Sequence, residues 1–261
     1  HAQYRIEVAS DLRRALEQQE LRVYFQPVHD LTTSRMVGVE ALVRWQHPQR
    51  GLVAPGEFIP IAERTGLIAE IDAWVLEQAC WQMCQWQAAG VDLSFVAVNI
   101  SSRLFARPEL YQLVSTVLAD TGLNPALLEL EVTESAVMDS SVVALEQMHR
   151  LRELGLRLAI DDFGTGFSSL LRLKRLPVQK LKIDQGFVAG LPGDDDDVAI
   201  VRAVIALAQS MGMQVHAEGI EYVEQAQFLL DHHCDLGQGY WFGRPMPARE
   251  LDWQRAPAIR P

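Results

Sequence analysis

Two adjacent acidic residues, Asp161 and Asp162, end a short apolar run and precede a loop that contains two glycines. The run from Leu156 is rich in leucine and isoleucine, which is typical of a buried strand, and Gly164 and Gly166 can adopt turn conformations closed to bulkier residues. A strand that ends in two carboxylates indicates a binding or catalytic site.

Other polar residues fall at the same kind of place, on or near the C-terminal end of a predicted strand. There is one for nearly every strand: Glu40, Asn99, Glu131, Asp161, Lys182, Glu218 and Gln238. In a (β/α)8 barrel the C-terminal strand ends converge on one mouth, so these scattered residues would form one site.

The chemistry of this group favours divalent cations. Four of the seven are carboxylates and Asp162 adds a fifth, so their repulsion would force some to take up protons unless cations were bound. Carboxylates and the Asn99 carbonyl favour hard ions, Mg²⁺ or Mn²⁺, and the lack of His and Cys argues against zinc. Asp161 could bridge two ions while Asp162 binds the second alone. Two ions about 3.5 to 4 Å apart suit hydrolysis of a phosphodiester by an activated water. Lys182 could orient that water or neutralise the charge that develops during the reaction.

The elements that would position these residues begin with an amphipathic helix at 8–19 and two strand-like segments at 22–28 and 36–45. The connection between the two strands is too short for a parallel crossover, so they should be antiparallel neighbours. A hairpin symmetric about Thr33 places Gln26 opposite Glu40.

The remaining chain alternates between helices and strands. A loop at 48–58 and a long helix at 58–89 lead into strands in FVAVNIS, LLELEVT, LRLAIDD, VQKLKID, MQVHAEG and LGQGYWF. The helices between them are expected at 108–120, 142–154, 168–176, 198–211 and 223–231. This order predicts an α/β protein, a TIM-like (β/α)8 barrel of eight strands with an antiparallel first strand; a doubly wound open sheet is the alternative.

Size and charge limit the functions that fit. The chain has 261 residues, 49% of them hydrophobic, and a formal net charge of −11, which argues against nonspecific binding of DNA or RNA. It has no apolar run near the roughly 18 residues of a membrane span and no signal-peptide pattern. It does not begin with Met, so we expect a domain taken from a longer protein.

Several other clusters have ordinary explanations. Cys80 and Cys84 are read as reduced thiols, and the run from His232 to Cys234 as a solvated helix end rather than a metal site. The acidic run 194–197 lacks the pattern of a calcium loop and would suit a helix start. FGTGFSS resembles a glycine-rich phosphate loop only in part, because GxGxxG is incomplete and no Lys-Ser/Thr follows, so binding of a nucleoside triphosphate is set aside.

Single site residues also have structural alternatives. Asn99 could cap a strand end, Glu218 could form a turn, and Lys182 could pair with Asp184 on the surface. Glu129 and Lys180 would lie two residues deeper on the same inward faces, where we expect a structural role.

Seven motifs together resemble one known family. EALVRW, VNIS, EVTES, DDFGTGFSS, LKID, AEGIE and QGYWFGRP look like the successive motifs of the EAL-domain phosphodiesterases, which hydrolyse the bacterial second messenger cyclic di-GMP to linear pGpG. The resemblance runs from Gln26 to Pro247. It implies a single EAL domain over 1–261, in which residues 1–20 lead into the barrel, from a larger signalling protein with regulatory domains. That protein would be cytoplasmic or membrane-anchored, with no membrane contact by this domain.

The resemblance also implies roles for the site residues. One cation would be held by Glu40, Asn99, Glu131 and Asp161, and the other by Asp161 and Asp162. Lys182 and Glu218 would lie around the attacking water, Glu218 as a candidate general base, and Gln238 would support the site. Glu134 would steady the loop 163–169, which positions Asp162 and contributes to a homodimer. Substrate contacts would come from Arg44 to phosphate and from Leu42, Gln26 and Glu221 near guanine and ribose.

Because every one of these positions is intact, the sequence predicts an active phosphodiesterase. Two alternatives remain: a catalytically silent receptor for cyclic di-GMP, and a broader metal-dependent phosphodiesterase for other small nucleotides.

Overall fold

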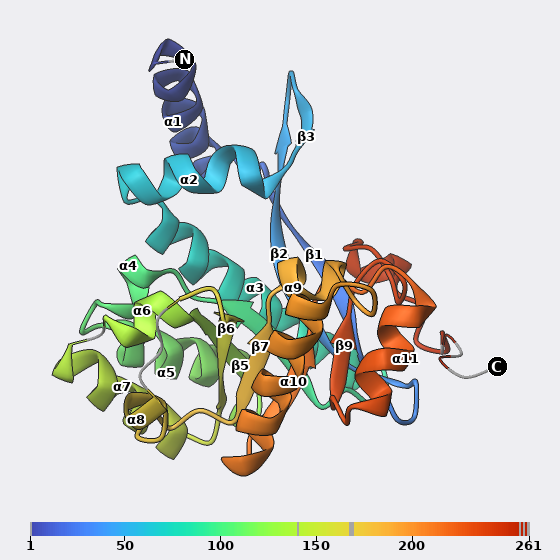
Figure 1. The fold of residues 1–261 in the computed structure, drawn as a ribbon. Coiled ribbons are helices and arrows are strands. Elements are labelled where there is room, and N and C mark those ends of the chain that lie inside the picture. The colour runs from blue at the N-terminus through green and yellow to red at the C-terminus, as the bar shows by residue number, and fades with distance from the viewer. Residues whose placement is uncertain (1, 140, 167–169, 256, 258, 260–261) are drawn as a thin grey trace.

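Eight strands close into a barrel in the computed structural model, which describes residues 2–139, 141–166, 170–255, 257 and 259 (Figure 1). Around the barrel the strands follow the order β1, β2, β4, β5, β6, β7, β8, β9, and β9 pairs back with β1. Their bounds are β1 Leu21–Asp30, β2 Met36–His47, β4 Phe95–Asn99, β5 Leu128–Thr133, β6 Arg157–Phe163, β7 Lys180–Ile183, β8 Gln214–Ala217 and β9 Leu236–Gln238. The closed barrel confirms the predicted fold class and excludes the open sheet.

The first strand runs against its neighbours, as predicted. β1 is antiparallel to both β2 and β9, whereas the pairs from β2–β4 to β8–β9 are parallel. The β1–β2 register places Gln26 opposite Glu40, which confirms the pairing expected from the short connection.

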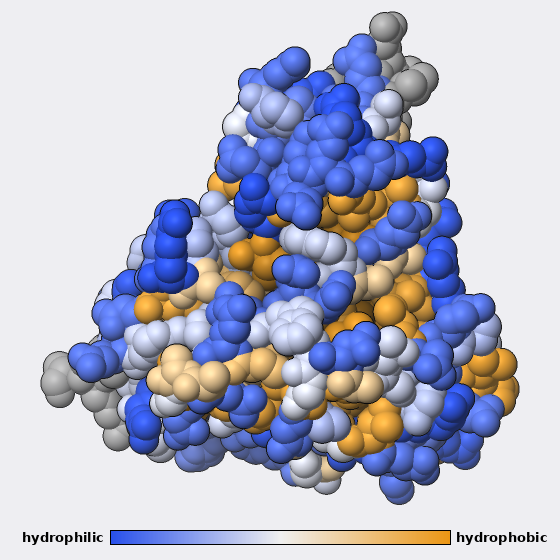
Figure 2. Space-filling model, turned by 180° about the vertical axis from the view of Figure 1, so that it is seen from behind, coloured by the Kyte–Doolittle hydropathy of each residue, from blue (hydrophilic) through white to orange (hydrophobic). Residues whose placement is uncertain are grey.

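Helices cover the outside of the barrel, and α1, α2 and β3 form a lobe at the top of the view (Figure 1). The helices are α1 Ala2–Glu17, α2 Pro55–Thr65, α3 Ile68–Ala88, α4 Ser102–Phe105, α5 Leu110–Thr121, α6 Glu134–Met138, α7 Val142–Glu153, α8 Leu170–Leu173, α9 Gln185–Ala189, α10 Asp195–Ser210 and α11 Val223–Asp231. Seen from the opposite side, this lobe is mostly hydrophilic, and hydrophobic side chains reach the surface in separate areas below it (Figure 2). Among the described helices, none is long and apolar enough to cross a membrane.

The prediction of one continuous helix over 58–89 is wrong, because two helices cover this region. Gly66, at φ 83°, ends α2 in the left-handed conformation that glycine tolerates, and α3 starts anew at Ile68. The preceding segment 48–58 is not all loop, because β3 (Gly51–Val53) pairs antiparallel with the outer end of β2. β2 is long enough to extend beyond the barrel, and β3 covers its projecting edge.

Smaller differences concern helix ends and short helices. α1 begins before the predicted 8–19 range, α10 begins three residues before 198 because Asp194 caps it, and α8 covers only part of 168–176. Ser168 and Ser169 lie outside the described residues. The one-turn helices α4, α6 and α9 follow strands β4, β5 and β7 and are too short to give a periodic signal.

The inside of the barrel is layered. A small apolar floor is made by Val28, Phe95, Ala97 and Leu236. Above it lies the buried pair Lys180–Glu129, with the ammonium nitrogen 2.6 Å from the carboxylate oxygen and 3.9 Å from the Phe95 ring centroid. Glu129 and Lys180 thus form a buried ion pair below the site, which agrees with the expected structural role. The next layer toward the mouth contains Lys182 and Glu131.

Candidate active site

The mouth of the barrel holds a cavity of about 400 Å³. Eight of the predicted site residues line it: Gln26, Glu40, Leu42, Arg44, Asp161, Glu218, Glu221 and Gln238. They come from β1, β2, β6 and β9 and from the segment after β8, so segments far apart in sequence meet as the barrel geometry requires.

Lys182 is fully buried and contacts three residues that line this cavity, Glu40, Asp161 and Glu218. Its Nζ lies 2.5 Å from Glu131 Oε2, 2.6 Å from Glu218 Oε1, 3.3 Å from Asp161 Oδ1 and 3.8 Å from Glu40 Oε2. Burial alone would lower the pKa of the ammonium, but attraction by these carboxylates outweighs it and raises the pKa well above its ordinary value. Lys182 is therefore a permanent cation among acids, and a surface pair with Asp184 is excluded, since Asp184 caps α9.

The carboxylates around Lys182 carry more negative charge than it can balance. Burial, with repulsion from Asp161 and Glu40, raises the pKa of Glu218 to about 8 against the attraction of Lys182. Burial and the neighbouring Asp161 raise the pKa of Asp162 to about 6. Burial also raises the pKa of Glu131 well above its usual range. With pKa values raised in this way, some of these carboxyl groups would hold protons near neutral pH, and a bound divalent cation would displace them.

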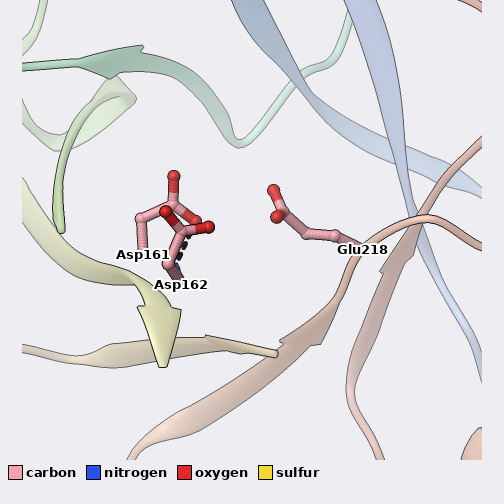
Figure 3. A group of neighbouring side chains, drawn as sticks. All are labelled: Asp161, Asp162 and Glu218. Atoms are coloured by element: carbon pink, nitrogen blue, oxygen red, sulfur yellow. Dashed lines mark hydrogen bonds between the residues drawn. The ribbon is translucent and has the colours of Figure 1, made fainter. Parts of the chain in front are cut away.

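The donor atoms fit such a cation. Asp161, Asp162 and Glu218 each offer a carboxylate oxygen, and these oxygens lie within 4.8 Å of one another. Figure 3 shows Asp161 and Asp162 at the end of β6 and Glu218 reaching toward them from the segment after β8. Glu131 Oε2 contacts Lys182, while its buried Oε1 has no hydrogen-bond partner in the described part of the chain. An all-oxygen set of this kind suits Mg²⁺ or Mn²⁺.

Glu40 is held by two amide side chains. Asn99 Nδ2 donates to its Oε1 at 2.6 Å, and Gln238 Nε2 donates to its Oε2 at 2.6 Å and to Gln26 Oε1 at 3.0 Å. Gln26 in turn donates to the Gly243 carbonyl at 3.1 Å. These hydrogen bonds fix the orientation of the Glu40 carboxylate and leave the Asn99 carbonyl oxygen available as a ligand atom.

The turn after Asp161 has unusual backbone geometry. Asp162 has φ 54°, and the β6–β7 pairing shifts register between Ile160 and Phe163, so Asp162 is displaced from the regular strand. Its backbone N–H donates to Asp161 Oδ1 at 3.0 Å. A non-glycine residue in this region is uncommon, and it directs the second carboxylate toward the same space as the first.

Glu134, the first residue of α6, lies against the glycines of the following loop. Its Oε2 accepts the Gly164 N–H at 2.8 Å, and a Cβ on Gly166 would lie 3.0 Å from its Oε1. Glu134 thus leaves little room for a side chain at Gly166, while at Gly164 a Cβ would lie 3.1 Å from the Phe187 ring in a backbone conformation, φ 100°, that favours glycine. The rest of the predicted loop, Phe167 to Ser169, lies outside the described residues.

A second cavity, of about 290 Å³, was not expected from the sequence. It shares Leu42 and Asp161 with the first and is lined mainly by apolar side chains of α2 and α3, together with Asn99 and Asp162. Its buried acid is Asp72, whose Oδ2 accepts the Ser101 N–H at 2.9 Å and whose pKa is raised by burial to about 6. In the sequence, Asp72 is an acidic residue on an otherwise apolar helical face, and that feature could have indicated this cavity.

The cysteine, histidine and acidic clusters that were not assigned to the site lie outside the barrel mouth. Cys80 is a buried free thiol, His232 ends α11 with its ring stacked on Phe228, and Asp194 caps α10. The expected solvated helix end is wrong for Cys234, which is buried because the chain turns inward there toward β9 and its thiol contacts the Val215 and Leu236 carbonyls. The three acids that follow Asp194 lie in the first turn of α10, as expected for an acidic helix start.

The fold and the site define a closed α/β barrel with an antiparallel first strand and an acidic cluster at its C-terminal strand ends. The chain belongs to the EAL domain family, whose profile matches residues 9–245.

Relatives with known names support the family assignment. The chain is 47% identical over 254 residues to the bifunctional diguanylate cyclase/cyclic di-GMP phosphodiesterase MucR of Pseudomonas aeruginosa, covering 96% of this chain and 37% of that protein. It is 42% identical over 247 residues to the cyclic di-GMP phosphodiesterase NbdA of the same organism, covering 95% of this chain and 32% of that protein. It therefore spans about a third of the length of these relatives.

A solved structure gives the corresponding three-dimensional match. The structure of the MucR phosphodiesterase in complex with c-di-GMP superposes with a TM-score of 0.91 at 46% sequence identity, covering 94% of this chain and 100% of that one. The likeness therefore extends over nearly the whole barrel.

Proposed function

We propose that this domain hydrolyses cyclic di-GMP to linear pGpG with the help of two divalent cations, Mg²⁺ or Mn²⁺. The observation that supports this most directly is the convergence of Asp161, Asp162 and Glu218 beside the buried ammonium of Lys182. The related MucR and NbdA are named as phosphodiesterases for the same dinucleotide.

Glu40, Asn99, Glu131 and Asp161 would hold one cation, and Asp161 with Asp162 the other. When bound, the cations polarise the phosphodiester and lower the pKa of water. The rigid support of Glu40 by Asn99 and Gln238 suits this ligand role, because a ligand that is already oriented loses little freedom on binding.

Glu218 and Lys182 would handle protons and charge during the reaction. Glu218 reaches toward Asp161 and Asp162 from the segment after β8 (Figure 3), and bound cations would lower its raised pKa, so that its free carboxylate is placed to accept the proton of the attacking water. Lys182 holds Glu218 in place through its 2.6 Å contact and balances negative charge that develops on the phosphate. Glu134 keeps the turn that carries Asp162 in position through Gly164.

The two cavities fit the two halves of a dinucleotide. Leu42 and Asp161 lie on the wall between them, so a phosphodiester at the carboxylates would place one purine in each. In the first cavity Arg44 would contact phosphate, while Gln26 and Glu221 offer hydrogen bonds to guanine and ribose. In the second, Asp72 offers a carboxylate acceptor to guanine N–H groups among apolar side chains.

Incubation with cyclic di-GMP and Mg²⁺ or Mn²⁺ tests the proposal. We expect pGpG by chromatography and none when the cations are chelated. Calorimetric binding without product would establish the silent receptor instead. Equal rates on cyclic di-AMP or on an unrelated phosphodiester would establish the broader enzyme.

We also propose that the domain forms a homodimer through α7 and α8. Apolar side chains are exposed on these helices, at 84% for Val142, 50% for Val143, 59% for Leu170 and 65% for Leu171. A second copy is the occupant we favour, because α8 directly follows the loop that positions Asp162. Light scattering should give a dimer mass that Val142→Glu with Leu171→Glu reduces to a monomer; a wild-type monomer would refute this.

The domain itself we propose to be the output module of a longer cytoplasmic or membrane-anchored signalling protein. The support is that the chain covers 37% and 32% of its named relatives. Regulatory domains would then act on the barrel from outside this chain.

A further inference from the structure

His216 is a buried histidine inside the barrel that the proposed chemistry does not use. It lies on β8, in register with Lys182 of β7 on one side and Leu236 of β9 on the other. Both neighbours point into the barrel, because Lys182 contacts the site carboxylates and Leu236 belongs to the apolar floor. Since paired residues of parallel strands share a face, His216 points inward between the floor and the catalytic layer.

The imidazole is neutral in these surroundings. Only 1% of His216 is exposed. Burial and the nearby ammonium groups of Lys182 and Lys180 lower its pKa well below the ordinary value. A neutral imidazole has one N–H donor and one acceptor nitrogen, and both need partners when buried. Neither ring nitrogen has a regular hydrogen bond to any described residue.

Gln238 has a buried acceptor oxygen, Oε1, that lacks a hydrogen-bond donor among the described residues. Both of its amide hydrogens are in use, because Nε2 donates to Glu40 Oε2 and to Gln26 Oε1. Gln238 lies beside His216, because Leu236 is the register partner of His216 and Gln238 follows two residues later on the same face of β9. A donor and an acceptor, both buried and both unsatisfied, therefore lie side by side.

We propose that His216 is a positioning residue that donates its ring N–H to Gln238 Oε1. The result is a directed series in which His216 donates to Gln238 and Gln238 donates to Glu40, each hydrogen bond polarising the next. His216 thus keeps the Gln238 amide turned toward Glu40 when the Glu40 charge is shared with a cation. This role rests on the proposed function, since Glu40 matters here as a cation ligand.

A set of variants tests the role in turnover. His216→Val removes the N–H and should lower kcat about fivefold with KM unchanged, the effect of losing a hydrogen bond worth about 1 kcal/mol. His216→Gln restores an N–H donor and should recover most of that loss. In a Gln238→Leu background, His216→Val should have no further effect, because the two residues act through one interaction. Additive losses in the double variant would overturn the proposal.

His29 provides a matched control. It is equally buried, but it stacks on Phe242, and its ring Nε2 lies 3.2 Å from the Arg255 carbonyl oxygen, away from the catalytic layer. His29→Gln should leave kcat unchanged. Thermal unfolding of all variants shows which retain the fold, and a turnover loss in His29→Gln equal to that of His216→Val would mean that any buried histidine supports the barrel in this way.

A spectroscopic measurement decides the question without turnover. In protein labelled with ¹⁵N histidine, His216 should give the signals of a neutral imidazole with one N–H. That N–H signal should shift in Gln238→Leu and stay unchanged in His29→Gln. An unchanged His216 signal in Gln238→Leu refutes the hydrogen bond even if the enzyme is active. A shifted signal in a protein that does not hydrolyse cyclic di-GMP supports the hydrogen bond and refutes only the proposed function.

Discussion

The buried ammonium of Lys182 is the most informative group to remove. In Lys182→Met, Glu131, Glu218, Asp161 and Glu40 lose the cation that lies 2.5 to 3.8 Å from their oxygens. Breaking a buried ion pair from one side costs about 3 to 5 kcal/mol in the free energy of unfolding. The carboxylates recover part of this by taking up protons, so we expect a loss near the lower figure.

Lys180→Met is the matched control, because it removes an equally buried ammonium two residues away. Lys180 contacts Glu129 at 2.6 Å and lies in the layer below, against the Phe95 ring. Its loss should destabilise the fold by a similar amount, about 3 kcal/mol or more. The two variants differ in how many carboxylates they leave without a partner.

The response to divalent cations should separate the two variants. In Lys182→Met the carboxylates lack their ammonium partner and should bind Mn²⁺ more tightly than in the wild type. At one fixed Mn²⁺ concentration this variant should therefore gain more stability in urea unfolding than the wild type, by about 1.4 kcal/mol for each tenfold decrease in Kd. Lys180→Met should gain no more from Mn²⁺ than the wild type does. Turnover should fall by roughly a hundredfold or more in Lys182→Met and by less than about fivefold in Lys180→Met.

Equal behaviour of the two variants would refute this reasoning. If both lost turnover alike, Lys182 would act through the stability of the barrel interior rather than at the reacting groups. If Mn²⁺ stabilised Lys182→Met no more than Lys180→Met at that concentration, the cation would not take the place of the missing ammonium charge.

Three further substitutions test separate parts of the site. Asp161→Asn should lower turnover by about a hundredfold or more, because it removes the carboxylate proposed to bridge both cations; near-normal pGpG formation would refute the two-cation assignment. Glu134→Ala removes the acceptor that lies 2.8 Å from the Gly164 nitrogen and should weaken Mn²⁺ binding and turnover about tenfold, whereas unchanged values would make the loop a simple connector. Asp72→Asn concerns pH. The folded-state pKa of Asp72 is about 6 against 3.8 for the free group, so its stabilising effect is present below pH 4 and lost as pH rises through 6. The variant should therefore gain up to about 3 kcal/mol of stability over the wild type between pH 4 and 7.5, measured by urea unfolding, and parallel pH profiles would contradict the assignment.

The sequence predicted the barrel and most of its mouth because both depend on local patterns. Period-two alternation identified the strand faces, and the short connection before Met36 forced an antiparallel hairpin, which placed Gln26 opposite Glu40. Once the strands form a barrel, residues at their C-terminal ends must converge.

What the sequence missed depends on packing between distant elements. β3 forms because β2 extends past the barrel and offers an unpaired edge. The three residues Gly51–Val53 are too few to show a strand pattern by themselves. The cavity beside Asp72 arises where α2 and α3 meet β2, and the sequence showed these helices as one. The break at Gly66 was visible as a glycine but was outweighed by the apolar periodicity on both sides.

The two inward layers show why local pattern does not by itself identify a site. Glu129 and Lys180 have the same residue types and spacing as Glu131 and Lys182, and both pairs are buried with nitrogen–oxygen distances of 2.6 and 2.5 Å. In the lower layer one ammonium balances one carboxylate. In the upper layer the strand ends bring three more carboxylates within 4 Å of the ammonium, and Asp162 lies beside them. That excess negative charge would make the apo barrel costly to fold unless protons or cations neutralise it, so the same feature that marks the layer as functional should also make its stability depend on the bound cation.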